Sequence, residues 1–224
     1  MSTILSNRVQ KIKPSATLAV SDKAKQLKSQ GVQIVSMGSG EPDFDTPVNI
    51  QKAAIQAIGD GETRYTAVDG TPQLKKAIRE KFKRENGLDY SVNEVMVSSG
   101  GKQVFYNLCQ AILSKGDEVI IPAPYWVSYP DIAILADATP VFIEAGLNQE
   151  FKITAEQLES SINANTKLFV LNSPSNPTGA VYTKSEIESL GKVLERHPHV
   201  HVISDDIYEH IRWEDDAFVN IAMA

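Results

Sequence analysis

The sequence predicts an α/β protein in which a mostly parallel sheet is flanked by helices, and three observations support this. From residue 94 onward, apolar strand-like runs alternate regularly with amphipathic helical stretches. The helical stretches are about 10 to 15 residues long, the length that connects neighbouring parallel strands. The 224 residues are 42% hydrophobic and 22% charged, which is the composition of an ordinary globular domain.

Four elements are expected before residue 94, and helix-capping residues define most of their ends. Ser15, Thr46 and Thr71 can each cap the first turn of a helix, and a proline follows the last two. Gly31 and Gly87 end two of these helices, because glycine readily adopts the left-handed conformation found there. The expected elements are a short strand within 32–40 and helices within 13–31, 45–61 and 70–87. In the last helix, one apolar face is expected from residues spaced four apart, Leu74, Ile78 and Phe82.

Nine elements are expected between residues 94 and 206. Two of the helices begin with a capping box, in which a threonine and a Glu or Gln three residues later bond each other's backbone N–H groups. These boxes pair Thr154 with Gln157 and Thr183 with Glu186. The expected strands lie within 94–100, 118–124, 139–145, 167–172 and 200–206, and the expected helices within 101–116, 126–137, 154–165 and 183–198.

Charge and hydropathy exclude several classes of partner. The net charge is −6 and no block of Lys and Arg is present, which argues against nucleic acid or an anionic membrane surface. No apolar run approaches the ~18 residues of a membrane-spanning helix, and the first residues lack a signal-peptide stretch. Cys109 is the one cysteine, so we expect a core thiol in a reducing cytoplasm rather than a disulfide or a nucleophile.

Polar and aromatic residues follow the predicted strands, where an open α/β sheet binds its ligands. The loop "LNSPSNPTGAVYT" after the strand 167–172 is notably polar and rigid, and it contains Asn176. Two readings of this loop stand: ordinary strand-ending residues, or an amide held for a ligand. Other strand ends lead to glycines, an aromatic ring, a carboxylate and a phenol, a set that suits a flat, charged ligand. These residues are Gly40, Gly101, Lys102, Trp126, Asp205 and Tyr208.

Each of these signals also has a purely structural reading. The turn "SSGGKQ" can leave N–H groups open for a phosphate at a helix N-terminus, but glycines also serve plain turns. It matches neither the Walker loop nor the G-x-G-x-x-G pattern. Trp126 can be a core indole, and "SDDIYEH" can be a capped turn with a solvated acid. The occurrence of these residues together at the strand ends is what favours a ligand-binding site.

Six blocks of the sequence together resemble the class I aminotransferases, which are pyridoxal-phosphate enzymes. The blocks are "SGEPDFDTP", "RYTAVDGTPQLKKAI", "SSGGKQVFYNL", "PAPYWVSYPD", "NSPSNPTGAVY" and "SDDIYEHI". They run in the family's order through nearly the whole chain from Lys13, and they are most similar to the prokaryotic aspartate and prephenate branch. The resemblance implies fold type I of the pyridoxal-phosphate enzymes. It also implies an N-terminal arm and small-domain segment over residues 1–45 and a large cofactor-binding domain over residues 46–224.

The resemblance also assigns roles to individual residues. Asp205 matches the acid that keeps the cofactor's pyridine nitrogen protonated, and the adjacent Asp206 is the weaker candidate. Trp126 matches the ring stacked on the cofactor, with a further part in binding the substrate. Asn176 and Tyr208 match the donors to the ring's phenolate oxygen, and Asn176 also matches a residue that faces the substrate carboxylate. Gly101 and Lys102 match the turn that binds the phosphate, and Tyr65 matches a tyrosine that reaches the partner subunit's phosphate. Gly40 matches the backbone contact to the substrate, and Lys13 matches a lysine linked to prephenate use.

One feature of the sequence departs from the family pattern. The family's Schiff-base lysine lies well beyond the tyrosine matched by Tyr208, and no lysine follows Tyr208 here. We therefore expect that lysine, and the arginine that binds the substrate α-carboxylate, beyond residue 224, and we assign no catalytic residue within the chain. The resemblance further implies a cytoplasmic homodimer with shared active sites, acting on amino acids and 2-oxo acids, with aspartate and 2-oxoglutarate foremost.

Three alternatives stay open on the sequence alone. The chain can belong to another enzyme of the same fold, such as a prephenate aminotransferase, a β-lyase or an aminocyclopropane-carboxylate synthase. It can also be a cofactor-binding fragment without turnover. A metal site is suggested by "HPHVH", where His199 and His201 would share a strand face, but no third ligand is evident and none is expected.

Overall fold

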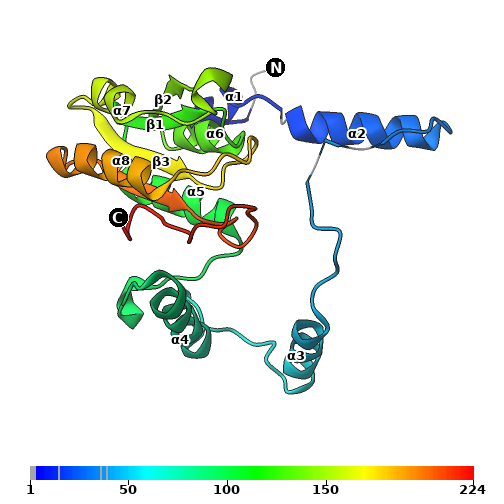
Figure 1. The fold of residues 1–224 in the computed structure, drawn as a ribbon. Helices are drawn as coiled ribbons and strands as arrows, with labels where there is room; N and C mark the ends of the chain where they lie inside the picture. Colours follow the sequence, from blue (N-terminus) through cyan, green and yellow to red (C-terminus); the bar gives the residue numbers. More distant parts are fainter. Residues whose placement is uncertain (1–3, 15, 36, 39) are drawn as a thin grey trace. The chain divides into compact units, whose positions relative to one another are not determined.

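The computed structural model contains a parallel sheet, as the alternation of elements predicts, and the described chain forms it from four of the five strands expected after residue 94 (Figure 1). The strand order is β2-β1-β3-β4. The structure describes residues 4–14, 16–35, 37–38 and 40–224. The strands are β1 (Glu118–Ala123), β2 (Thr139–Glu144), β3 (Thr166–Asn172) and β4 (His201–Asp205).

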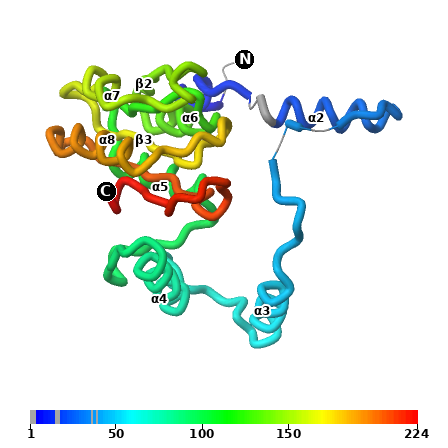
Figure 2. The backbone as a smooth tube through the Cα atoms, in the orientation of Figure 1, coloured from blue at the N-terminus to red at the C-terminus, as the bar shows by residue number. Residues whose placement is uncertain are grey.

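The strand order changes direction beside β1, and this defines where a ligand would bind. From β1 the chain crosses to β2 on one side, and it then returns past β1 to β3 and β4 on the other side. The crossovers can be followed along the tube in Figure 2. In such sheets the ligand crevice lies beyond the carboxyl ends of the two strands at the switch. Here these strands are β1 and β3.

Helices cover both faces of the sheet and form two apolar cores. Helices α5 (Gly101–Ile112) and α6 (Ser128–Leu135) pack on one face, and α7 (Ala155–Ser161) and α8 (Lys184–Arg196) pack on the other. Along β3, Leu168 and Val170 belong to the first core, whereas Phe169 and Leu171 belong to the second. This alternation explains why β3 reads as a continuous apolar run in the sequence.

Several local expectations are confirmed. Both capping boxes form, at the starts of α7 and α8. Thr71 caps α4 (Pro72–Lys81), which continues into a π-helical turn η1 (Phe82–Asn86) before Gly87 ends it with a φ of 69°. Cys109 is fully buried in the first core, where loss of hydration raises the pKa of its thiol to about 12.

The chain forms two compact units, and each is described by itself. One unit combines Met1–Ile12 with Asp69–Ala224, and the other is Lys13–Val68. The first unit also includes α1 (Asn7–Gln10) and two 3₁₀ turns, η2 (Val92–Glu94) and η3 (Leu147–Gln149). The second unit contains α2 (Ala16–Ser29) and α3 (Val48–Gly59). The predicted domain division after residue 45 stays a prediction.

Four sequence expectations are wrong in detail. The segment 94–100 is not a strand: Glu94 is the last residue of η2, and residues 95–100 pair with no strand of the described chain. The described part of 32–40 also lacks a strand, and Ser36 and Ser39 of that segment, like the expected cap Ser15, lie outside the described residues. Thr46 does not cap α3, because Pro47 occupies the cap position. On α4, Leu74 is exposed and the neighbouring Lys75 is buried, because Lys75 has an ionic partner nearby.

Candidate functional site

Three strand ends and one helix start supply the candidate site. β1 leads into Tyr125 and Trp126, β3 leads into the loop with Asn176, and β4 ends at Asp205. α5 begins at Gly101, which lies at the N1 position after the left-handed Gly100. The two strands at the topological switch therefore both deliver predicted site residues.

A continuous row of contacts joins four of the predicted residues. The Lys102 ammonium lies 5.2 Å from the centroid of the Trp126 ring. The Trp126 ring meets the Tyr129 ring edge to face, with centroids 5.2 Å apart. The Tyr129 hydroxyl donates a 2.6 Å hydrogen bond to Oδ2 of Asp205. Asn172 Nδ2 then donates to the Asp205 carbonyl, and Asn172 Oδ1 accepts from the backbone N–H of Asn176, both at 2.8 Å.

Tyr129 and Asn172 are the links that the sequence reasoning missed. Tyr129 is 3% exposed, and both burial and the nearby Asp205 carboxylate raise the pKa of its hydroxyl. It therefore stays protonated and can only donate to Asp205. Asn172 is the last residue of β3, where its side chain braces β4 and the loop that follows β3. The i, i+3 spacing from Trp126 to Tyr129 at the start of α6 was the available signal.

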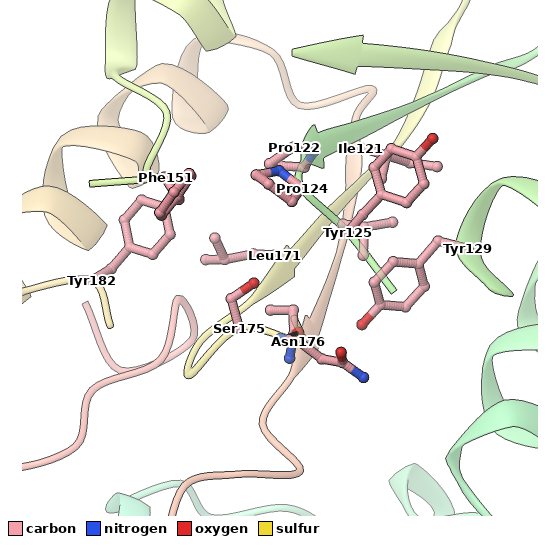
Figure 3. Close-up of a pocket in the computed structure, with 12 residues that line it drawn as sticks. Ile121, Pro122, Pro124, Tyr125, Tyr129, Phe151, Leu171, Ser175, Asn176 and Tyr182 are labelled. Carbon is pink, nitrogen blue, oxygen red and sulfur yellow. Dashed lines mark hydrogen bonds between the residues drawn. The ribbon is translucent and has the colours of Figure 1, made fainter. Parts of the chain in front are cut away.

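Asn176 and Tyr208 line one cavity beside this row. The cavity has a volume of about 290 Å³ and lies between the loop after β3 and the segment 208–214. Asn176 also borders a second pocket of only about 20 Å³ at the ends of β1 and β3. In Figure 3, Tyr125 and Tyr129 lie on one side of this second pocket and Phe151 and Tyr182 on the other. Neither cavity, as formed by the described residues, is lined by Trp126 or Asp205.

The start of α5 has the open geometry that binds an anion. Gly100 precedes the helix with a φ of 93° and provides no side-chain cap. No described atom lies within 4 Å of the position that a Cβ would take on Gly101. The first N–H groups of a helix have no partner within it, and they carry the positive end of the helix dipole. We call residues 98–102 the phosphate turn.

Asp205 and Asp206 have different surroundings. Both carboxylate oxygens of Asp206 accept 2.6 Å hydrogen bonds, one from the Ser204 hydroxyl and one from Asn220 Nδ2. Burial raises the pKa of Asp206, although these two hydrogen bonds oppose the shift. Asp206 therefore holds the chain segment around Asn220, whereas Asp205 faces Tyr129 and the aromatic row.

Three predicted residues lie in the second unit, which is described by itself. Lys13, Gly40 and Tyr65 belong to the second unit, so their roles stay predictions. The expectation that His199 and His201 share a strand face is wrong, because β4 begins at His201 and His199 precedes it. The described chain does bring Glu85, Glu209 and His210 together, but Lys81 forms ion pairs with both glutamates and Arg84 forms a second one with Glu85, so cations already pair with the two carboxylates.

Comparison with known proteins shows relatives along almost the whole of this chain. The chain is 58% identical over 220 residues to the probable aspartate/prephenate aminotransferase of Rickettsia felis, covering 98% of this chain and 54% of that protein. It is 57% identical to the aspartate/prephenate aminotransferase of Nitrosomonas europaea, with coverages of 98% and 55%. The chain thus spans about half the length of these curated relatives.

Solved structures place the same fold in aspartate aminotransferases. The enzyme from Rhizobium meliloti matches with a TM-score of 0.95 at 47% identity, covering 99% of this chain and 56% of that one. The aspartate aminotransferase of Thermus thermophilus with maleate matches with a TM-score of 0.93 at 46% identity, covering 97% and 56%. The expected fold type I is thereby confirmed. The profile of aminotransferase class I and II matches residues 32–224, and the chain belongs to this family of pyridoxal-phosphate enzymes.

Proposed function

We propose that the complete protein is an aminotransferase that moves an amino group between aspartate and 2-oxoglutarate. The observation that carries the proposal is the row from Lys102 through Trp126 and Tyr129 to Asp205. It sets a cationic helix start, an aromatic face and a carboxylate side by side at the ends of parallel strands. This set of groups fits pyridoxal 5'-phosphate, which has a phosphate, a flat ring and a basic ring nitrogen.

Each residue of the site has a distinct task in this proposal. The Gly101 and Lys102 N–H groups and the Lys102 ammonium bind the phosphate, and Trp126 stacks on the ring. Asp205 holds a proton at the ring nitrogen, while the Tyr129 hydrogen bond fixes the direction of its carboxylate. Asn176 and Tyr208 donate hydrogen bonds to the ring's phenolate oxygen. When bound, the cofactor supplies an electron sink for the charge that develops at the substrate α-carbon.

Substrate and assembly are further parts of the proposal. Gly40, Asn176 and Trp126 contact the amino-acid substrate, and Lys13 supports the use of prephenate. Tyr65 reaches the phosphate of a partner subunit in a homodimer. The complete exposure of Tyr65 and the lack of buried side chains on α3 are compatible with such a contact. We place the protein in the cytoplasm because Cys109, the one cysteine in residues 1–224, is a buried free thiol. Within the described chain, no helix is long and apolar enough to cross a membrane.

A substrate panel tests this function. The complete protein with pyridoxal phosphate should convert aspartate and 2-oxoglutarate to oxaloacetate and glutamate, and the Asp205→Ala variant should lose this conversion. Replacing 2-oxoglutarate with prephenate tests the second substrate. The Lys13→Ala variant should then lower prephenate use more than 2-oxoglutarate use. Release of ammonia without transfer of the amino group would instead indicate a lyase and reject the proposal.

A further inference from the structure

Lys75 is the one charged side chain that the described chain buries, with 5% of its surface exposed. It lies on α4, one turn after the Thr71 cap. An ammonium group loses its hydration on burial and needs an ionic partner to stay charged. Asp69 supplies this partner: its carboxylate accepts a hydrogen bond from Lys75 Nζ, and this contact is the first cause of the lowered pKa of Asp69.

The partner of Lys75 is itself bound to the strand-like segment before the phosphate turn. The Asp69 carbonyl accepts a 3.0 Å hydrogen bond from the backbone N–H of Val97. Gly70 brings the two segments into close contact, because a Cβ at that position would lie 2.6 Å from Val97 Cγ2. Gly70 also has a φ of 104°, which a residue with a side chain adopts only with strain. Asp69 and Gly70 thus hold Val97 through both a hydrogen bond and packing.

Val97 leads directly into the phosphate turn. Gly100 N–H donates to the Ser98 carbonyl at 2.8 Å, and Ser99 N–H donates to the Gln103 side chain. These bonds shape the turn internally but do not fix its place. Among the main-chain hydrogen bonds of the described residues, the one from Val97 to Asp69 is the one that anchors segment 95–100 to an element outside 92–104.

We propose that Lys75 is a positioning residue for the phosphate turn, acting through Asp69 and Val97. This inference rests on the proposed function, in which the turn binds the phosphate of pyridoxal phosphate. Only the Lys75 side of this ion pair is buried, because the Asp69 side chain is 49% exposed, and such a pair contributes little net stability. In this proposal the ion pair fixes the orientation of Asp69, and it thereby holds the Asp69 carbonyl in the position where it accepts the hydrogen bond from the Val97 N–H.

Cofactor binding to the cofactor-free complete protein tests this role. Pyridoxal 5'-phosphate and pyridoxal differ in the phosphate group alone, so the ratio of their Kd values reports on the phosphate turn. In Lys75→Met, the Kd for pyridoxal phosphate should rise about tenfold, as expected for the loss of about one well-placed hydrogen bond. The Kd for pyridoxal should stay unchanged. The matched control is Lys76→Met, because Lys76 is the adjacent lysine on α4 and forms only an exposed ion pair with Glu80.

A second variant and a second measurement keep the test decisive. Asp69→Asn removes the charge from the partially exposed side of the pair and should produce the same change in the Kd ratio, even if Lys75→Met does not fold. Hydrogen exchange without cofactor should be faster at Val97 in both variants and unchanged in Lys76→Met. Equal weakening of both ligands, or an unchanged Kd ratio, would overturn the role of Lys75. If the unmodified protein binds pyridoxal and pyridoxal phosphate with equal Kd values, the assignment of residues 98–102 to the phosphate is wrong. The proposed function then loses its support, whatever the role of Lys75.

Discussion

The hydroxyl of Tyr129 donates a 2.6 Å hydrogen bond to the carboxylate of Asp205, across 76 residues of sequence. Tyr129 lies at the start of α6, and Asp205 is the last residue of β4. Because Tyr129 is buried and its hydroxyl has a raised pKa, it remains a donor throughout the physiological pH range. The contact gives Asp205 a fixed orientation before any ligand arrives.

Removing this hydrogen bond should impair the complete enzyme without unfolding it. Tyr129→Phe keeps the ring that packs on Trp126 but leaves Asp205 without its donor. A hydrogen bond to a charged group contributes about 1.5–3 kcal/mol, so we expect turnover to fall roughly tenfold or more. Tyr125→Phe is the matched control, because Tyr125 lies four residues earlier, in the loop between β1 and α6, and stacks on Phe142. Equal turnover in the two variants would contradict the role of Tyr129.

The two adjacent acids should respond differently to alanine substitution. Asp205→Ala removes the predicted partner of the cofactor's ring nitrogen, so turnover should be nearly abolished. It also leaves the buried Tyr129 hydroxyl without its acceptor, so the melting temperature should fall as well. Asp206→Ala leaves Ser204 and Asn220 without their acceptor, so it should lower the melting temperature and retain much of the turnover. Activity assays and thermal melts of both variants check this. Equally mild losses of turnover in the two would reject the assignment of Asp205.

The proposed homodimer makes a complementation experiment possible. If Tyr65 serves the partner's site, a dimer of one Tyr65→Phe subunit and one Asp205→Ala subunit has one site with both defects and one intact site. Random mixing makes half of the dimers hybrid, so about a quarter of the wild-type sites should be restored. Each variant unmixed is the control. A protein that is monomeric by light scattering and fully active in the assay would exclude shared sites.

The thiol of Cys109 should be unreactive in the folded protein. Burial raises its pKa to about 12, so the reactive thiolate is scarce at neutral pH, and its fraction increases only as the pH approaches that value. A chromogenic disulfide reagent at pH 8 should therefore modify Cys109 only after the protein is denatured. Rapid modification of the native protein would show that the core around Cys109 opens.

The fold was largely predictable because its signals are local. Capping boxes, glycine stops and apolar runs each depend on a few neighbouring residues, and those at α7, α8 and η1 formed as expected. The segment 94–100 failed because a strand depends on a neighbouring strand, which its own residues cannot specify. Lys75 was missed for a similar reason. Its place on α4 predicts a solvated face, but its burial depends on Asp69, which precedes the helix.

The site was predictable as a set of residue types but not as a network. Trp126, Asn176 and Asp205 could be selected because each follows a strand in a recognisable block of sequence. Tyr129 and Asn172 were missed because they act on other residues across long sequence separations, 76 and 33 residues from Asp205. The residues around Tyr129 and Asn172 do not indicate that Asp205 is their distant partner.

The described row contains one lysine, Lys102, and its ammonium lies over the Trp126 ring. Lys75 and Lys152 are already held in ion pairs. The chain spans about half the length of its curated relatives, and no lysine follows Tyr208 in it.

We therefore expect the lysine that holds the cofactor to lie outside residues 1–224. Borohydride reduction of the complete protein with pyridoxal phosphate, followed by peptide mass mapping, should place one label per subunit on a peptide from outside this segment. Lys102→Arg is the control: it should keep the label, because we assign Lys102 to the phosphate rather than to the aldehyde carbon of the cofactor. A stoichiometric label on any lysine from Lys11 to Lys192, in a protein that stays active, would show that residues 1–224 contain the lysine that holds the cofactor. That result would reject our expectation.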